Sequence, residues 1–317
     1  MLRGRRGLSV FLTTLFLVSS IPIIGAQDTE SSYVRAESLV IVVHDNVSHD
    51  STAYTQGLEF HQGRLFESTG LYGNSTLREV NLSTGSVIRS VDLNASEFGE
   101  GMTFVDDEII QLTWKEGIAY RYQMETFDIV ANYTYEGEGW GLAYDGDQLI
   151  MSNRTDVLTL RNATTFEIEG TLNVTLNGEP LDKINEMEIW GGMLLANIYQ
   201  TEEIVGIDLN SGVAILRIDA SGLRPQGAGV MNGIAFDSST QSLWITGKEW
   251  PMMYNVTFIE PETPTEQEPE VDQPSSNDDK FVYSNAILAI MLVAVVILLS
   301  MNLKDGGRNP PDEGALE

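Results

Sequence analysis

Hydrophobic and polar side chains alternate in short segments along most of the chain, and turns rich in Gly, Asn and Asp separate these segments. The alternation is clearest in four pairs: Leu58 and Phe60, Met102 and Phe104, Leu142 and Tyr144, Ile234 and Phe236. A period of two is typical of strands that bury one face. We find no sustained helical period before the C-terminal region, so the pattern predicts an all-β domain whose alternating side chains pack between sheets.

A short motif recurs five times, each time at the start of a predicted strand. Its markers Gln56, Glu100, Trp140, Asn185 and Asn232 follow one another at intervals of 44, 40, 45 and 47 residues. Repeats of roughly 40–50 residues made of short strands are typical of propeller blades. The sequence therefore predicts a five-bladed β-propeller over residues 37–258, with four antiparallel strands in each blade.

The β-rich segment Ser38–His44 precedes the first repeat and has no repeat of its own. An unpaired strand at the edge of a sheet is a liability that closed folds avoid. We expect this segment to close the ring by pairing with the last blade.

The first strands of propeller blades surround the central axis, so the five markers are expected to face one pocket. Glu100 is the only carboxylate among them. The following strands end in Trp114, Tyr199 and Lys248, and antiparallel pairing would place these ends beside the same pocket. Apolar and aromatic surroundings would raise the pKa of such a carboxylate towards neutrality. The structural alternative for Glu100 is a solvated acid in a turn.

The composition of the chain argues against several classes of function. The net charge is −28, from 46 acidic and 18 basic residues, which argues against a nucleic-acid partner. The chain has no cysteine, so neither a disulfide nor a catalytic thiol is present. His44, His49 and His61 do not have the spacing of metal ligands. We therefore expect no metal site and no cofactor.

The N-terminal region has the pattern of an export signal. Three arginines precede the apolar run Leu8–Ile24, which predicts a signal peptide over residues 1–26, followed by a polar lead over 27–36. An uncleaved anchor helix is the alternative. Nine Asn-x-Ser/Thr sequons favour an exported glycoprotein; they begin at Asn46, Asn74, Asn81, Asn94, Asn132, Asn153, Asn162, Asn173 and Asn255.

The C-terminal region predicts membrane attachment. Residues 259–280 form an acidic segment rich in Pro, Glu and Gln, which is typical of an extended stalk. The next 23 residues, 281–303, contain no charge and are long enough for a transmembrane helix; a buried core helix is the alternative. Lys304 and Arg308 follow, which favours a cytoplasmic tail over residues 304–317. The expected location is the cell surface, with the N-terminal domain outside.

Several segments together resemble the plant and microbial type of glutaminyl-peptide cyclotransferase. The resemblance extends over about residues 51–258. It is carried by Tyr54-Thr55-Gln56-Gly57-Leu58, Phe98-Gly99-Glu100-Gly101, Gln111-Leu112-Thr113-Trp114, Gly137-Glu138-Gly139-Trp140-Gly141-Leu142, Ile184-Asn185-Glu186-Met187-Glu188, Asn232-Gly233-Ile234-Ala235 and Thr246-Gly247-Lys248-Glu249-Trp250-Pro251. It implies a five-bladed propeller that converts an N-terminal glutamine into 5-oxoproline and releases ammonia, without the zinc of the animal-type enzyme.

The resemblance also assigns residues to roles. The family's acid/base glutamate falls on Glu100. Its substrate-binding residues fall on Tyr54, Gln56, Phe98, Trp114, Trp140, Asn185, Tyr199 and Lys248. Two positions depart from the family pattern, because Tyr54 replaces a phenylalanine and Tyr199 replaces a tryptophan. Both changes keep an aromatic ring, so they bear on substrate preference more than on the chemistry.

Three points stay open from the sequence alone. The donor that stabilises the carboxamide oxygen could be Lys248, Asn185 or Gln56. Asn232 could contact the substrate or have a structural role. A catalytically silent propeller that binds peptides or glycans is the alternative function, because one propeller frame supports many activities. A propeller lyase or sugar dehydrogenase would need metal or quinone ligands, which we do not find.

Overall fold

The computed structural model describes residues 33–262 of the 317-residue chain. Within this range all helix and strand assignments are β-strands, 22 in number, which confirms the predicted all-β class. No helix in residues 33–262 has the length and apolar character needed to cross a membrane. The predicted signal peptide (1–26), transmembrane helix (281–303) and tail (304–317) lie outside the described residues, as do most of the polar lead and of the stalk.

Three sheets contain four antiparallel strands each. The first consists of β2 (Thr55–His61), β3 (Arg64–Thr69), β4 (Thr76–Val80) and β5 (Val87–Asp92). The second consists of β6 (Gly99–Val105), β7 (Glu108–Thr113), β8 (Ile118–Gln123) and β9 (Ile129–Thr134). The third consists of β10 (Leu142–Tyr144), β11 (Gln148–Met151), β12 (Val157–Asn162) and β13 (Ile168–Asn173).

The remaining strands form one ten-stranded sheet in the order β16-β17-β18-β19-β1-β22-β21-β20, with β14 paired to β19 and β15 paired to β14. The bounds are β1 (Glu37–Ser48), β14 (Thr175–Leu176), β15 (Glu179–Pro180), β16 (Ile184–Trp190), β17 (Met193–Ile198), β18 (Glu203–Asp208), β19 (Val213–Asp219), β20 (Met231–Asp237), β21 (Ser242–Gly247) and β22 (Met252–Ile259).

Strand β1 joins the two ends of the folded chain. It pairs antiparallel with the last strand, β22, from Val40 to Ser48, which confirms the expected closure by the N-terminal segment. It also pairs in parallel with β19 from Glu37 to Val40. This second pairing was not predicted, and it merges two groups of strands, β16–β19 and β20–β22 with β1, into a single sheet.

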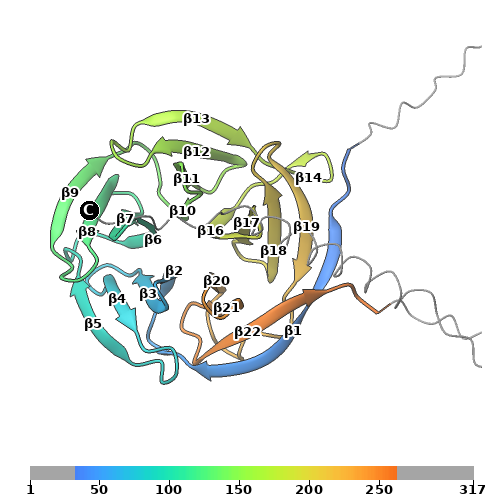
Figure 1. Ribbon diagram of the computed structural model, residues 1–317, viewed down its shortest axis with the longest axis horizontal. Helices are drawn as coiled ribbons and strands as arrows, with labels where there is room; N and C mark the ends of the chain where they lie inside the picture. The colour runs from blue at the N-terminus through green and yellow to red at the C-terminus, as the bar shows by residue number, and fades with distance from the viewer. Residues whose placement is uncertain (1–32, 263–317) are drawn as a thin grey trace, which may run out of the picture. The chain divides into compact units, whose positions relative to one another are not determined.

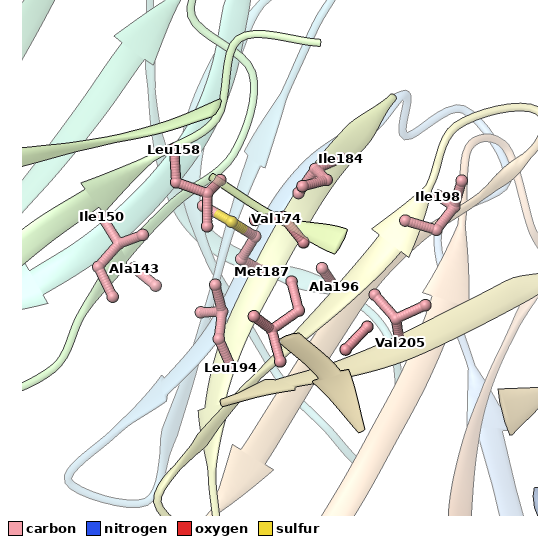
Figure 2. Packing of buried hydrophobic residues seen from close by; sticks show 12 residues of the cluster. Ala143, Ile150, Leu158, Val174, Ile184, Met187, Leu194, Ala196, Ile198 and Val205 are labelled. Carbon is pink, nitrogen blue, oxygen red and sulfur yellow. The ribbon is translucent and has the colours of Figure 1, made fainter. Parts of the chain in front are cut away.

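The sheets follow one another around a common centre, and the first strand of each group lies innermost (Figure 1). Buried hydrophobic clusters fill the spaces between successive groups. In Figure 2, Ile150 and Leu158 of the third sheet face Met187 and Leu194 of the next group. Four further clusters join the other neighbouring groups, and the last of them packs β20–β22 against β2–β4. The core is therefore distributed around the ring, and the alternating residues pack between sheets as predicted.

Glycines allow the inner strands to approach one another closely at the centre. A Cβ atom on Gly57 would lie 2.7 Å from the Met102 nitrogen, and one on Gly141 would lie 1.9 Å from the Asn185 oxygen. Both distances are shorter than a van der Waals contact, so a side chain is excluded at these positions. Glycine follows the marker in four of the five repeats, as Gly57, Gly101, Gly141 and Gly233. Close backbone neighbours exclude a side chain at the first three, whereas Gly233 has a φ of 126°, which favours glycine.

The fourth repeat has Glu186 where the others have glycine. Its buried carboxylate accepts hydrogen bonds from the backbone nitrogens of Ile234 at 2.8 Å and Leu58 at 3.4 Å. Burial raises the pKa of Glu186 well above its usual range. The side chain therefore crosses the centre of the ring and ties β16 to β20 and β2. A small cavity of about 130 Å³ lies further along the inner strands than Glu186, and Glu59 and Glu188 form part of its lining.

Candidate active site

A cavity of about 340 Å³ opens where the inner strands begin. Its lining consists of Tyr54, Gln56, Phe98, Glu100, Trp114, Trp140, Arg154, Asn185, Tyr199, Gln200 and Lys248. All nine residues selected from the sequence as catalytic or substrate-binding candidates are in this group. Four of the five repeat markers line the cavity, and the fifth, Asn232, is buried behind them. The strand starts therefore converge as expected.

Glu100 is the only carboxylate in the cavity lining, and it is 4% exposed. The glycines on both sides are required by close backbone neighbours. A Cβ atom would lie 2.6 Å from the Thr69 oxygen at Gly99 and 2.6 Å from the Trp140 oxygen at Gly101. The Ser68 hydroxyl donates a hydrogen bond to the backbone oxygen of Glu100. These contacts fix the backbone, so the carboxylate has a defined position in the cavity.

The environment of Glu100 favours its neutral form. Burial is the main reason why the pKa of Glu100 lies well above its usual value, and repulsion from Glu138 and Glu116 adds to it. The ammonium group of Lys248 acts in the opposite direction and lowers the pKa of Glu100. A carboxyl group with a raised pKa can both accept and return a proton near neutral pH.

Lys248 is the cation that faces this carboxyl group. Its side chain is 4% exposed, and burial lowers the pKa of Lys248 to about 8, although Glu100 opposes that shift. The Nζ atom lies 4.6 Å from the ring centre of Tyr54 and 5.5 Å from that of Tyr199. Aromatic faces attract cations at such distances. Lys248 thus supplies a positive charge inside the cavity that titrates close to physiological pH.

The side-chain amides of Asn232 and Gln56 form a row of hydrogen bonds that ends at Glu100. Asn232 Nδ2 donates to Gln56 Oε1 at 3.0 Å and also to the backbone oxygen of Thr55 at 2.9 Å. Gln56 Nε2 then donates to Glu100 Oε1 at 3.2 Å. Asn232 therefore orients Gln56, which in turn contacts the carboxyl group. This answers one open question, because Asn232 has a structural role behind the cavity wall.

Asn185 is the third amide at the cavity. It is 2% exposed, and its Oδ1 atom is buried without a hydrogen-bond partner among the described residues. A buried acceptor that stays unpaired costs free energy. Because Asn185 lines the cavity, a bound molecule with an N–H group could satisfy this oxygen. Asn185 is thus better placed to accept a hydrogen bond from a ligand than to stabilise a negative charge.

Aromatic rings form the cavity walls in two groups. On one side the ring centres of Phe98 and Trp114 are 5.6 Å apart, and Tyr54 meets Phe98 edge-on at 6.1 Å. On the other side Trp140 and Tyr199 are in edge-to-face contact at 5.1 Å. Tyr54 and Tyr199, the two departures from the family pattern, therefore keep the contacts of an aromatic wall. These rings reduce the access of water to Glu100.

Sequence reasoning missed two lining residues, Arg154 and Gln200. Both have left-handed backbone conformations, with φ of 79° and 66°, and both follow the second strand of their group. Gln200 is next to Tyr199, and Arg154 occupies the corresponding loop after β11. The positions directly after the second strands, which hold Trp114, Tyr199 and Lys248, correspond to Ser152 in the third repeat, so the strand ends alone do not indicate Arg154.

Histidines and metal ligands do not contribute to the cavity. His49 is buried and bonds to the Trp250 backbone oxygen at 2.7 Å and to Glu67 at 3.0 Å. Within residues 33–262, no group of three or more His, Asp or Glu side chains is arranged to hold a metal ion. The chemical groups that face the cavity are thus one carboxyl, one titratable ammonium group, one guanidinium, amides and aromatic rings.

A family model, a related protein and a solved structure all indicate the same protein family. Residues 16–258 match the model of a family described as glutamine cyclotransferase. A glutaminyl-peptide cyclotransferase of Arabidopsis thaliana is 34% identical over 217 residues, which cover 66% of this chain and 68% of the relative. The crystal structure of Myxococcus xanthus glutaminyl cyclase superposes with a TM-score of 0.67 at 32% identity, covering 71% of this chain and 98% of that one.

Proposed function

The chain belongs to the glutamine cyclotransferase family and is an enzyme of that family, and from this premise we propose that it converts the N-terminal glutamine of peptides or proteins into 5-oxoproline. The observation that carries the proposal is the buried Glu100 with Lys248 and Asn185 in one aromatic cavity. The cavity volume of about 340 Å³ suits one terminal residue.

We propose a mechanism in which Glu100 carries the proton. The α-amine nitrogen of the substrate forms a bond to the carbonyl carbon of its own side-chain amide. Glu100 accepts a proton from this nitrogen and returns it to the amide nitrogen, whose bond to carbon then breaks to release ammonia. Both reacting groups belong to one residue, so binding has only to fix their orientation. The raised pKa of Glu100 supports both proton steps.

Lys248 is the donor that we assign to the carboxamide oxygen. Gln56 is already engaged with Glu100 and Asn232, and Asn185 presents an unpaired acceptor. Of the three candidates named from the sequence, the ammonium group of Lys248 remains to stabilise the negative charge that develops on the oxygen. Asn185 Oδ1 would accept a hydrogen bond from the substrate's amine or amide nitrogen. This scheme uses no metal, in keeping with the groups that line the cavity.

The fold supports the proposal that the frame is a five-bladed propeller. Apart from the short strands β14 and β15, the ten-stranded sheet divides into two groups of four, β16–β19 and β20–β22 with β1, which the parallel β1–β19 pairing joins. Together with the three separate sheets this makes five groups, and five hydrophobic clusters lie between them. An experimental structure with β20–β22 packed elsewhere than between β16–β19 and β2–β5 would contradict this count.

The proposed activity is tested with the purified full chain and a short peptide that begins with Gln. We expect release of one ammonia per peptide and a matching loss of mass. The same peptide with an acetylated N-terminus lacks the nucleophile, as does a peptide with Gln at its second position, and neither should react. Binding of the first peptide without ammonia release would favour the alternative of a non-catalytic propeller that binds peptides or glycans.

We also propose that the enzyme domain is exported, glycosylated and attached to the membrane by residues 281–303, with a cytoplasmic tail. The support comes from the sequence patterns at the two ends and from the nine sequon asparagines, each of which is exposed or partly exposed. Mass analysis of the protein from a membrane fraction tests this. A chain that retains residues 1–26, carries no glycan and washes off the membrane would contradict it.

A further inference from the structure

We propose that Glu138 is a positioning residue that holds the two tryptophans of the cavity wall in place. A single oxygen, Oε2, accepts hydrogen bonds from Trp114 Nε1 at 3.1 Å and from Trp140 Nε1 at 3.0 Å. Glu138 lies in the loop between β9 and β10 and is not part of the cavity lining. It thus acts on the cavity from behind the rings. The functional part of this inference rests on the proposed cyclotransferase activity.

The backbone around Glu138 is fixed by close contacts. The Gly139 nitrogen donates to the Trp114 backbone oxygen at 2.8 Å, and the Trp140 nitrogen donates to the Ser152 oxygen at 3.1 Å. A Cβ atom on Gly139 would lie 2.9 Å from the Thr113 backbone oxygen and 2.3 Å from the Tyr135 hydroxyl oxygen, so glycine lets the loop pass close to the Thr113 backbone. The carboxylate therefore has a defined starting point between the two indoles, although it belongs to a loop.

The two indoles come from different sheets and belong to different walls of the cavity. Trp114 follows β7 and contacts Phe98, whereas Trp140 precedes β10 and contacts Tyr199. The Nζ atom of Lys115 lies 3.6 Å from the ring centre of Trp114 and 3.7 Å from Glu138 Oε1. The shared carboxylate oxygen thus couples the two walls, and without it both indole N–H groups would lose their acceptor.

The side chain of Glu138 both accepts the two indole hydrogen bonds and contributes a negative charge near Glu100. Two substitutions separate these effects. The charge of Glu138 is one of the two neighbouring charges that raise the pKa of Glu100. The amide of Glu138→Gln keeps an oxygen with two lone pairs, which can accept both indole hydrogens, but it removes the charge. Glu138→Leu removes both the acceptor and the charge. Glu136, two residues upstream, is exposed, so Glu136→Leu is a matched control.

The first readout is the NMR spectrum of the indole N–H groups, of which the chain has five. In Glu138→Leu we expect the signals of Trp114 and Trp140 to move and to exchange faster with solvent. In Glu138→Gln both should stay protected from exchange. The other three indole signals should be unaffected in every variant. Unchanged signals for both tryptophans in Glu138→Leu would overturn the inference.

The second readout is turnover of the peptide that begins with Gln. Misplacing groups by about 1 Å can cost a factor of about 10² in rate, so we expect Glu138→Leu to lower kcat/KM by about 10- to 100-fold, mainly through KM. We expect Glu138→Gln to recover most of this loss. The acid limb of the pH–rate profile of Glu138→Gln should lie at lower pH than that of the wild type, because loss of the negative charge at position 138 lowers the pKa of Glu100.

The two proposals fail in different ways. Absence of ammonia release from the wild-type protein would contradict the proposed function, whereas the indole signals would still test the contacts of Glu138. An active wild type together with equal kcat/KM values for Glu138→Gln and Glu138→Leu would contradict the positioning role alone. Loss of activity in Glu136→Leu would show that the effect is not specific to position 138, and it would also count against this role.

Discussion

Glu100→Gln is expected to lower kcat/KM for a peptide that begins with Gln by about 10²- to 10⁴-fold, the range typical of a lost general acid/base. Gln has nearly the same shape as Glu but cannot take up a proton at neutral pH. The fold should persist, because the backbone at Glu100 is fixed by Gly99, Gly101 and Ser68. The measurement is the rate of ammonia release over a range of peptide concentrations, combined with thermal unfolding.

A matched control for this change is Glu179→Gln, which alters an exposed residue of β15. It should leave both the rate and the melting temperature close to those of the wild type. If Glu100→Gln released ammonia as fast as this control, Glu100 could not be the proton carrier. A large fall in melting temperature for Glu100→Gln would point instead to a structural role of this carboxyl group.

Lys248→Met is expected to lower kcat/KM by about 10²- to 10³-fold, as is typical when one donor to a developing oxyanion is removed. Methionine is apolar and of similar length, so it suits the space between the rings of Tyr54 and Tyr199. The change should also move the acid limb of the pH profile to higher pH. The reason is that Lys248 lowers the pKa of Glu100, and its removal ends that effect.

The alkaline side of the pH profile provides a separate check on Lys248. The pKa of Lys248 is lowered to about 8, so the ammonium form is lost as the pH rises through 8 and activity should fall there. Lys248→Arg keeps its charge in this range, so whatever activity it retains should not show that decrease. All variants are compared on one peptide, because the substrate's own amine also titrates near this pH. An unchanged rate and profile in Lys248→Met would exclude the assigned role.

Much of the architecture could be predicted because strands and repeats leave periodic patterns in the sequence. Alternation in segments such as Leu58 to Phe60 indicated strands, and the spacing of the markers indicated that Gln56, Glu100 and Asn185 would meet. Such spacing fixes which backbone positions are equivalent. It does not fix where a side chain points, so Asn232 was equivalent in sequence but lies behind Gln56 and not in the cavity.

Other features depended on contacts between segments that are distant in sequence. From the sequence Glu138 is recognisable only as part of a family motif, because its role depends on Trp114, 24 residues away. Glu186 stood out only as a missing glycine, and its bonds to Ile234 and Leu58 require the closed ring. The parallel pairing of β1 with β19 likewise depends on the order of strands in space. Comparison of the residue that follows the marker in all five repeats identifies Glu186 as an exception, but it does not indicate the bonds that its carboxylate makes.

The central claim is that a terminal glutamine binds with its reacting atoms beside Glu100. A crystal structure of the Glu100→Gln variant with a bound peptide that begins with Gln tests it most directly. We expect the α-amine within hydrogen-bond distance of the side chain at position 100, the carboxamide oxygen facing Lys248, and an N–H group of the glutamine bonded to Asn185 Oδ1. A peptide seated elsewhere, or one whose terminal glutamine points away from position 100, would contradict the account.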